Sequence, residues 1–319
     1  MPLPSPESIS RLATEQQNFA SQALDTKSAL EIATIINSED AKVAGAVSKA
    51  LPQIAEAIDT IADSLRSGGR LIYIGAGTSG RIAALDAAEC PPTFNTDAKQ
   101  VQFVIAGGEK ALGRAVEANE DSPDLGQRDI AKLKPTKKDV VVGIAASGRT
   151  PYTVAAVEYA KKKRARTVAV SCSPDSPLAR AADIAITAEV GPEVVSGSTR
   201  MKAGTAQKMI LNMLTTGAMT RLGYVYGNLM VNVGLKNEKL IERGITILNK
   251  AADLDRELAR RALDDSGGSV PIALVMIKSG ASRREASRKL KAARGNVRRA
   301  IEPTGSATSS VSRSSPRMR

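Results

Sequence analysis

The 319-residue chain has no histidine, no tryptophan, only two cysteines and few aromatic residues. The missing histidine removes the commonest general base and the commonest metal ligand of proteins. Cys90 and Cys172 lie far apart and do not form a metal-ligand spacing. We therefore expect no metal site, no disulfide scaffold, and free thiols in a reducing compartment.

Long apolar runs are also missing. No stretch approaches 18 apolar residues without a charge, and the first 16 residues lack the apolar centre of a signal peptide. These absences predict no membrane span and a cytoplasmic location. Hydrophobic residues nevertheless make up 42% of the chain and aromatics only 3%. The core should therefore be aliphatic and alanine-rich, as in packed helices and buried parallel strands.

Positive charge is abundant but unevenly spread. The formal net charge is +12, and most of it lies in residues 243–319. A basic region of this kind can touch nucleic acid or an acidic surface. The alternative is a solvated helical face followed by a disordered tail, and this is the interpretation that we favour. Nucleic acid is accordingly not an expected partner.

The N-terminal part shows helical patterns of unequal strength. Residues 7–37 are weakly patterned, and Ser38 is a candidate N-cap ahead of Glu39 and Asp40. From residue 43 to residue 65, apolar side chains recur at steps of three and four, which predicts one apolar helical face. Pro52 interrupts it, so we expect either a kink or two consecutive helices.

Strands and helices then alternate, which predicts a parallel sheet covered on both faces. The expected strands are 71–75, 101–108, 139–146, 167–172 and 182–188, and the expected helices are 79–88, 109–119, 151–163 and 201–222. Residues 226–301 look all-helical, and the tail that follows is rich in Ser and Arg. We divide the chain into an N-terminal helical segment (1–50), an α/β domain (51–225), a C-terminal helical module (226–301) and a disordered basic tail (302–319).

The first motif with chemical meaning is Gly75-Ala-Gly77-Thr78-Ser79-Gly80, which follows a strand and opens a helix. As a bare pattern it matches the dinucleotide fingerprint. That fingerprint also needs an acidic residue at the end of the second strand, where this chain has Ala106-Gly107-Gly108. Backbone amides at a helix start form an anion site with or without a nucleotide, and a tight turn without any ligand is the remaining alternative.

The second motif, Ala145-Ala146-Ser147-Gly148-Arg149-Thr150-Pro151, follows the clearest strand. It places hydroxyls three residues apart around a glycine, and Pro151 suits the first turn of the next helix. Two hydroxyl-rich loops at strand ends favour a bound phosphate, because ligands of open α/β sheets lie beyond the carboxyl ends of strands. Arg149 either helps to bind that anion or faces solvent.

Two further stretches are ambiguous by themselves. Residues 193–202 form a polar entry to the long helix, with Glu193, Ser198 and Lys202 as candidate ligand contacts, or with Ser198 or Thr199 as an ordinary N-cap. In Glu89-Cys-Pro-Pro, the Pro-Pro pair should end a helix, and a carboxylate there meets the negative end of the dipole. That position disfavours the charged form and suits a general acid. Without other information, Glu89 and the acidic stretch around Glu120 look like solvated surface.

Together these residues resemble the N-acetylmuramic acid 6-phosphate etherases. The resemblance is carried by five stretches in order: GGRLIYIGAGTSGRIAALDAAECPPTF, IAGGEKALGRAVEANEDS, DVVVGIAASGRTPY, EVVSGSTRMKAGTAQKMILNML and GNLMVNVGLKNEKL. It runs from about residue 6 to residue 301 and leaves out the tail. No single motif is decisive, but five long stretches in order are specific.

The resemblance implies a fold and a reaction. The fold is a sugar isomerase (SIS) domain, a three-layer α/β sandwich with a five-stranded parallel sheet, joined to N-terminal helices and a small C-terminal helical module. The chain is implied to form a homodimer. The implied reaction uses water to convert N-acetylmuramic acid 6-phosphate to N-acetylglucosamine 6-phosphate and D-lactate, a step in peptidoglycan recycling. It requires no cofactor.

The resemblance also implies residue roles. Glu89 matches the proton donor and Glu120 the second catalytic carboxylate. We expect Glu89 to protonate the leaving lactate, and the sequence leaves open which of the two removes the proton at C2. The substrate-binding positions are taken to be Gly77, Thr78, Ser79, Ser147, Gly148, Thr150, Glu193, Ser198 and Lys202. Glu89 lies about ten residues beyond the glycine-rich loop, or roughly 15 Å along a helix. Either the helix is shorter than predicted, or Glu89 serves the site of a partner subunit.

Two other functions compete with this one. A non-catalytic sugar-phosphate sensor would use the same fold, as the glucokinase regulatory protein does with two SIS domains in a longer chain. A single copy with both glutamates in place favours the enzyme. A nicotinamide-dependent dehydrogenase would rest on the glycine pattern alone, and the absent acidic residue and the second hydroxyl-rich loop argue against it.

Overall fold

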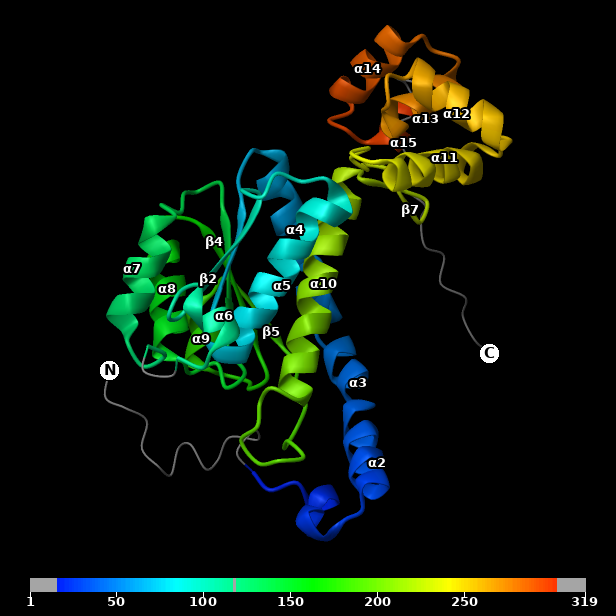
Figure 1. The fold of residues 1–319 in the computed structure, drawn as a ribbon. Coiled ribbons are helices and arrows are strands. Elements are labelled where there is room, and N and C mark those ends of the chain that lie inside the picture. The colour runs from blue at the N-terminus through cyan, green and yellow to red at the C-terminus, as the bar shows by residue number, and fades with distance from the viewer. Residues whose placement is uncertain (1–15, 117–118, 303–319) are drawn as a thin grey trace, which may run out of the picture. The chain divides into compact units, whose positions relative to one another are not determined.

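The computed structural model describes residues 16–116 and 119–302 and divides into two compact units after Leu222. The first unit contains the sheet, and the second, which begins at Gly223, is largely helical (Figure 1). Each unit is considered by itself below. The predicted tail lies almost wholly outside the described residues, as do residues 7–15 of the expected first helix.

A five-stranded parallel sheet forms the centre of the first unit, as predicted. Its strands are β1 (Leu71–Gly75), β2 (Val101–Ile105), β3 (Val140–Ile144), β4 (Arg166–Ser171) and β5 (Ile184–Thr187). Their spatial order is β2-β1-β3-β4-β5, and Leu71 pairs with both Val101 and Val140. Strands β1 and β3 are buried along their whole length, which is why their apolar runs are continuous instead of alternating.

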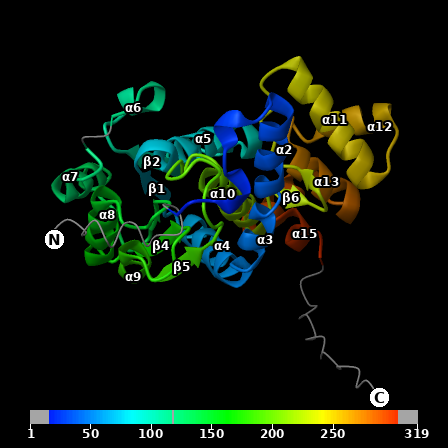
Figure 2. The ribbon, with the colours of Figure 1, turned by 90° about the horizontal axis from the view of Figure 1, so that it is seen from below.

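Helices cover both faces of the sheet and make three layers (Figure 2). On one face α4 (Leu51–Arg66), α5 (Gly77–Phe94) and α10 (Lys202–Leu222) pack together. On the other face α8 (Pro151–Lys162) and α9 (Pro177–Ala181) lie against the strands, and α7 (Pro123–Lys132) packs on α8. The chain-wide scarcity of aromatics is visible here, since Val, Ile and Ala make up most of this core.

The N-terminal helices differ in detail from the prediction. Helix α2 (Ala29–Asp40) begins at Ser28, where the side chains of Ser28 and Glu31 form a capping box. Ser38 therefore lies inside a helix and is not the predicted N-cap. The reason is that Ser28 has a glutamate three residues later, which satisfies two amides reciprocally. After α3 (Val43–Ser48), Pro52 lies in the first turn of α4, so the two-helix alternative is correct.

Helix α5 is longer than predicted at both ends. Pro91 and Pro92 lie inside its last turns, and the helix ends only at Asn95, which has a left-handed conformation. The prediction that the Pro-Pro pair ends the helix is therefore wrong. A proline removes one N–H and crowds the preceding turn, but near a C-terminus few later bonds remain to be lost. Conversely, the helix expected over 109–119 shrinks to α6 (Lys110–Gly113).

The second unit is a set of short helices around one apolar core. It comprises a two-stranded ribbon of β6 (Val225–Tyr226) and β7 (Leu229–Met230), then α11 (Glu238–Ala252), α12 (Arg256–Asp265), α13 (Val270–Ser279), α14 (Arg283–Ala292) and α15 (Val297–Ile301). The ribbon corrects the all-helical prediction for this region. Ile245, Leu248, Leu274 and Val297 are buried in the core, whereas the Arg and Lys side chains of α14 are exposed.

Candidate functional site

A pocket of about 350 Å³ lies where the strand order reverses. Strand β1 is followed in sequence by β2 on one side, whereas β3 lies on its other side, so the loops after β1 and β3 diverge to opposite faces of the sheet. Crevices of this kind are the usual ligand sites of open α/β sheets. Both predicted hydroxyl-rich loops line the pocket, through Thr78, Ser79, Ser147 and Thr150.

The loop after β1 presents amide groups to the pocket. Ala76, the residue before α5, has an extended backbone, and its side chain does not cap the helix. Gly77 has a φ of 51°, and the first turn of α5 contains no acidic residue. Ala76 therefore does not cap the first N–H groups of α5, which lie at the positive end of the helix dipole. A phosphate or a carboxylate is the ligand that such a helix start favours.

The loop after β3 is tightly constrained at Gly148. Its φ is 64°, and a Cβ there would lie 2.2 Å from Ser176 Oγ. The Gly148 carbonyl accepts a hydrogen bond from Leu178 N at 2.9 Å. Gly148 is thus not a lining residue but the turn that holds its neighbours Ser147 and Thr150 in the pocket. Pro151 follows at the uncapped start of α8, as predicted.

Glu120 brings a carboxylate into the pocket. Its Oε1 lies 3.0 Å from the position that a Cβ on Gly77 would occupy, and its carbonyl accepts from Tyr152 N at 3.1 Å. The side chain therefore stands over the start of α5. The sequence alone had placed this residue in a solvated loop, whereas the structure places its half-buried side chain in the lining of the pocket.

The third wall of the pocket comes from residues 190–199, which we call the wall loop. Gly197 and Thr199 line the pocket, whereas the predicted Ser198 does not. Glu193 is fully buried and accepts hydrogen bonds at 3.0 Å from the amides of Lys202 and Ala203. It thereby caps α10, the role that we had considered for Ser198 or Thr199. The start of α10 is occupied by this carboxylate and is closed to a ligand.

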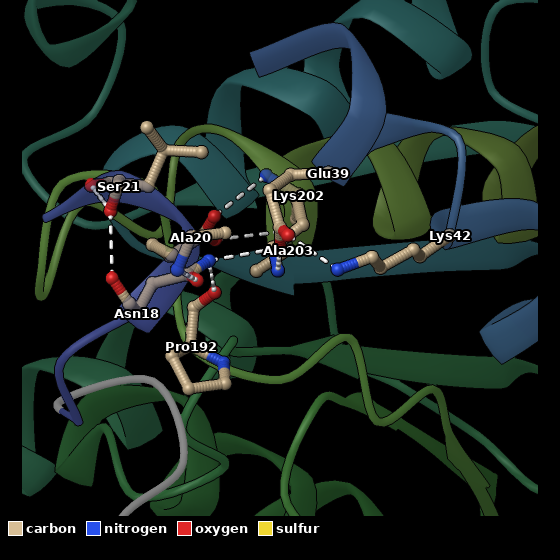
Figure 3. Close-up of polar contacts among 10 residues, drawn as sticks. Asn18, Ala20, Ser21, Glu39, Lys42, Pro192, Lys202 and Ala203 are labelled. Carbon is tan, nitrogen blue, oxygen red and sulfur yellow. Dashed lines mark hydrogen bonds and ion pairs between the residues drawn. The ribbon is translucent and has the colours of Figure 1, made fainter. Parts of the chain in front are cut away.

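Lys202 also lies outside the pocket. Its ammonium is buried and contacts Glu39 Oε2 at 2.6 Å (Figure 3). Burial alone would raise the pKa of Glu39, but hydrogen bonds from Lys202, Lys42 and Asn18 outweigh it and lower the pKa to about 2. The structure therefore assigns Glu193 and Lys202 to the frame of the site and not to its lining.

Arg81 and the residues after β2 line the pocket without having been predicted. Arg81 Nε and Nη2 donate to the carbonyls of Ala111 and Arg114 at 2.9 and 2.8 Å. This holds the segment that carries Ala115 and Val116 against α5. No local pattern announces such a role, because both acceptors are backbone carbonyls about thirty residues away. Arg149 is half-buried and is not a lining residue.

Glu89 does not reach this pocket. It is exposed and lies twelve residues after Gly77 in the continuous helix α5, which corresponds to about 18 Å along the axis. One turn earlier, Asp86 accepts hydrogen bonds from Tyr73, Asn212 and Thr215. Burial raises the pKa of Asp86, and these bonds partly oppose that shift. This region of α5 is thus firmly attached to β1 and α10.

An apolar groove of about 650 Å³ lies between α4 and α10, on the face of the sheet that these helices cover together with α5. Its lining includes Ile54, Ile58, Met209 and Met213, together with the exposed Leu51. Asn212 belongs to this groove and also bonds to Asp86 in α5. Asn212 thus links the groove to the turn of α5 that precedes the exposed Glu89.

The pocket combines hydroxyls, the start of α5, one arginine and one carboxylate. Among the described residues, no group of three or more acidic or cysteine side chains could hold a metal ion, and no described helix is long and apolar enough to cross a membrane. This lining suits a phosphorylated polyhydroxy compound. The profile of the SIS domain matches residues 126–217, and that of the glucokinase regulatory protein N-terminal SIS domain matches residues 53–161. The fold and the site thus define a SIS-domain protein.

Comparison with whole proteins narrows this class. The chain is 54% identical to the N-acetylmuramic acid 6-phosphate etherase of Edwardsiella ictaluri over 92% of its length and 98% of that protein, and 52% identical to that of Klebsiella aerogenes over 93% and 99%. A phosphoheptose isomerase structure from Francisella tularensis superposes on 61% of the chain and all of that protein, with 19% identity and a TM-score of 0.47. The chain belongs to the N-acetylmuramic acid 6-phosphate etherase family.

Proposed function

We propose that this protein cleaves the D-lactyl ether of N-acetylmuramic acid 6-phosphate. The products are N-acetylglucosamine 6-phosphate and D-lactate. The family membership supports the identity of the substrate. The proton transfer is supported by the carboxylate of Glu120, which lies in the pocket at the start of α5. The helix start and the hydroxyls bind the phosphorylated sugar, while the carboxylate handles a proton. Such a reaction on recycled cell-wall sugar belongs in the cytoplasm.

The reaction proceeds by elimination and then addition. In the open-chain aldehyde the C2 proton is acidic, and Glu120 removes it. The C3–O bond then breaks, its electron pair stays on the lactyl oxygen, and a general acid protonates that oxygen. D-lactate leaves an unsaturated aldehyde, to which water adds at C3 while a proton returns to C2. Two carboxylates are enough for these transfers, and the chain needs no cofactor for them.

Glu89 supplies the acid from a partner subunit in this proposal. Because α5 is continuous from Gly77 to Phe94, the short-helix alternative is removed, and Glu89 cannot fold back to its own pocket. Glu89 is exposed, and the same unit carries the apolar groove between α4 and α10. A second copy of the chain covering that groove would bring Glu89 toward the partner's pocket and make the homodimer obligatory for catalysis.

The first experiment measures D-lactate release from N-acetylmuramic acid 6-phosphate. Wild type should release lactate, and Glu120→Gln should lose about 10²- to 10⁴-fold in kcat, the usual contribution of a general acid or base. Asp121→Asn, at an exposed neighbouring carboxylate, serves as the matched control and should stay near wild type. A folded wild type that releases no lactate contradicts the proposal.

Subunit mixing tests the position of Glu89. Glu89→Gln and Glu120→Gln homodimers should each be inactive. After unfolding and refolding together in equal amounts, they should recover about a quarter of the wild-type activity, because half of the dimers are mixed and each holds one intact site. If both glutamates served the same subunit, every site in the mixture would lack one of them and activity would stay absent.

The second candidate is a sugar-phosphate sensor. The match of residues 53–161 to the glucokinase regulatory protein N-terminal SIS domain favours it. Calorimetry distinguishes the two functions. Saturable binding of the sugar phosphate with no lactate release would support the sensor, whereas turnover would exclude a purely regulatory role.

A further inference from the structure

The N-terminal arm, residues 16–42, lies against the wall loop and is joined to it by hydrogen bonds. Asn18 Nδ2 donates to the Pro192 carbonyl at 3.1 Å, and Ser21 Oγ donates to the Val194 carbonyl at 2.7 Å. Figure 3 shows Asn18 from the arm beside Pro192, with Ser21 on the other side of Asn18. These bonds join segments more than 170 positions apart, so the arm holds the wall loop at the stretch just ahead of its pocket-lining residues.

Glu39 completes a closed ring of contacts around this junction. Its carboxylate accepts from Asn18 Nδ2 at 2.9 Å and from Lys202 Nζ at 2.6 Å. Asn18 binds Pro192, the next residue Glu193 binds the amide of Lys202, and the Lys202 side chain returns to Glu39. One carboxylate therefore positions the wall loop by two routes, through the side-chain amide and through the start of α10.

Polar contacts, not a core, attach the arm. Within α2 as described, Glu39 is the one buried residue, while Phe19 and Leu30 are largely exposed. The apolar side chains Leu24, Ile32, Ile35 and Ile36 of the described arm are only partly buried, so they support it less than a core would. The wall loop contains no helix or strand and turns through positive-φ glycines at 191 and 197. Its own anchors are the buried Val190, Glu193 and Val194, which lie ahead of the pocket-lining residues.

We propose that Asn18 and Glu39 are positioning residues that hold the wall loop, and with it Gly197 and Thr199, in the conformation that binds the sugar phosphate. The substrate in this inference rests on the proposed function, whereas the tethering does not. When only a fraction of molecules holds the binding conformation, the apparent dissociation constant rises by the inverse of that fraction. The arm therefore sets affinity and not the chemical step.

The kinetic test compares Asn18→Leu with Lys42→Met. Asn18→Leu removes the donor shared by Glu39 and Pro192, and KM should rise about tenfold while kcat stays within about twofold, the signature of lost ground-state positioning. Lys42 pairs with the same Glu39 carboxylate, but it is exposed, and within the described part of the chain it makes no hydrogen bond or ion pair with the wall loop. Lys42→Met should therefore leave KM unchanged.

A test of Glu39 requires a variant that still folds. Replacing it alone would leave the buried Lys202 ammonium without a counter-ion. The double change Glu39→Gln with Lys202→Met removes both charges at similar volume and should raise KM as Asn18→Leu does. Glu39→Asp, which keeps the charge, should recover part of the affinity.

Hydrogen exchange gives a readout that is independent of turnover. Backbone amides of residues 193–201 should exchange about tenfold faster in Asn18→Leu and in the double variant, but not in Lys42→Met. Unchanged exchange and unchanged KM in a folded Asn18→Leu would overturn the inference. If wild type releases no lactate but the exchange pattern holds, the proposed reaction fails and the positioning role stands.

Discussion

At the scale of single residues, the pocket depends on a few backbone positions that only glycine adopts easily. Gly77 and Gly148 both have positive φ, and each lies in a loop that lines the site. A Cβ on Gly77 would meet only the end of the Glu120 side chain, which can rotate away. Around Gly148 the neighbour is Ser176, which caps α9, so that turn has little freedom.

Gly148→Ala should damage both stability and binding. A left-handed alanine costs about 1–2 kcal/mol, and its Cβ would collide with Ser176. We expect a loss of at least about 2 kcal/mol in the free energy of unfolding, together with a raised KM because Ser147 and Thr150 shift. Denaturant unfolding and lactate kinetics check this. Gly45→Ala, in a helix with open space around it, is the control and should stabilise slightly.

Glu39 should make stability depend on pH in a defined window. Its pKa is about 2 in the folded protein against 4.5 ordinarily, so its contribution is fully present above pH 4.5 and is lost as the pH falls through 2. The amount is of the order of 3 kcal/mol at neutral pH. Unfolding free energies of wild type and of the Glu39→Gln, Lys202→Met double variant, measured between pH 6 and pH 3, should converge toward low pH. A pH-independent difference contradicts this assignment.

At the scale of elements, helix α5 connects the pocket to the opposite side of the unit. Its first turn meets the ligand, and its later turns are joined to β1 and α10 through Asp86. Because Asp86 accepts from the buried Tyr73 hydroxyl and from two side chains of α10, it determines how α5 and α10 lie together. The same contacts determine the position of the exposed Glu89, which lies one turn later.

Asp86→Ala should destabilise the first unit strongly. The change leaves the Tyr73 hydroxyl, the Asn212 amide and the Thr215 hydroxyl without this acceptor. Unsatisfied buried groups cost about 1–3 kcal/mol each, so we expect a loss of at least about 3 kcal/mol in the free energy of unfolding. Asp59→Ala, which breaks an exposed pair with Arg221, should change it by less than about 1 kcal/mol. Equal effects of the two changes would contradict this role of Asp86.

Local sequence predicted most elements but fewer of their ends. The strands were found because β1 and β3 are continuous apolar runs, and Pro151 marked the start of α8. The end of α5 was missed because the Pro-Pro pair is tolerated in a last turn. Glu193 was misjudged as a ligand contact because its true partners, the amides of Lys202 and Ala203, become visible only when the wall loop folds back.

At the scale of the whole molecule, the exposed groove between α4 and α10 is the feature that a single chain leaves unexplained. It is apolar, and Asn212 in its lining bonds to Asp86, one turn before the exposed Glu89. Large apolar patches on soluble proteins usually mark interaction sites. A second copy of the chain covering the groove would account at once for the groove and for the distance of Glu89 from its own pocket.

Met213→Asp should separate the subunits and stop turnover together. A carboxylate in the middle of the groove would be buried without a partner on association. Light scattering should show a monomer, circular dichroism an intact fold, and the lactate assay a loss of activity. Met213→Leu keeps the apolar surface and should remain dimeric and active. An active monomeric Met213→Asp would place both glutamates in one subunit and contradict the shared site.

The sequence by itself determined the layered α/β fold, the two hydroxyl-rich loops and the absence of histidine chemistry, because each depends on residue types and on neighbours within one or two turns. The tertiary structure decided the rest. It placed Glu120 over Gly77 and kept Glu89 away from the pocket of its own chain. It also joined Glu39, Glu193 and Lys202 in contacts that support the pocket from outside its lining. The Glu120–Gly77 and Glu39–Lys202 contacts join residues tens to more than a hundred positions apart, and local pattern contains no information about which distant partner a buried charge will meet.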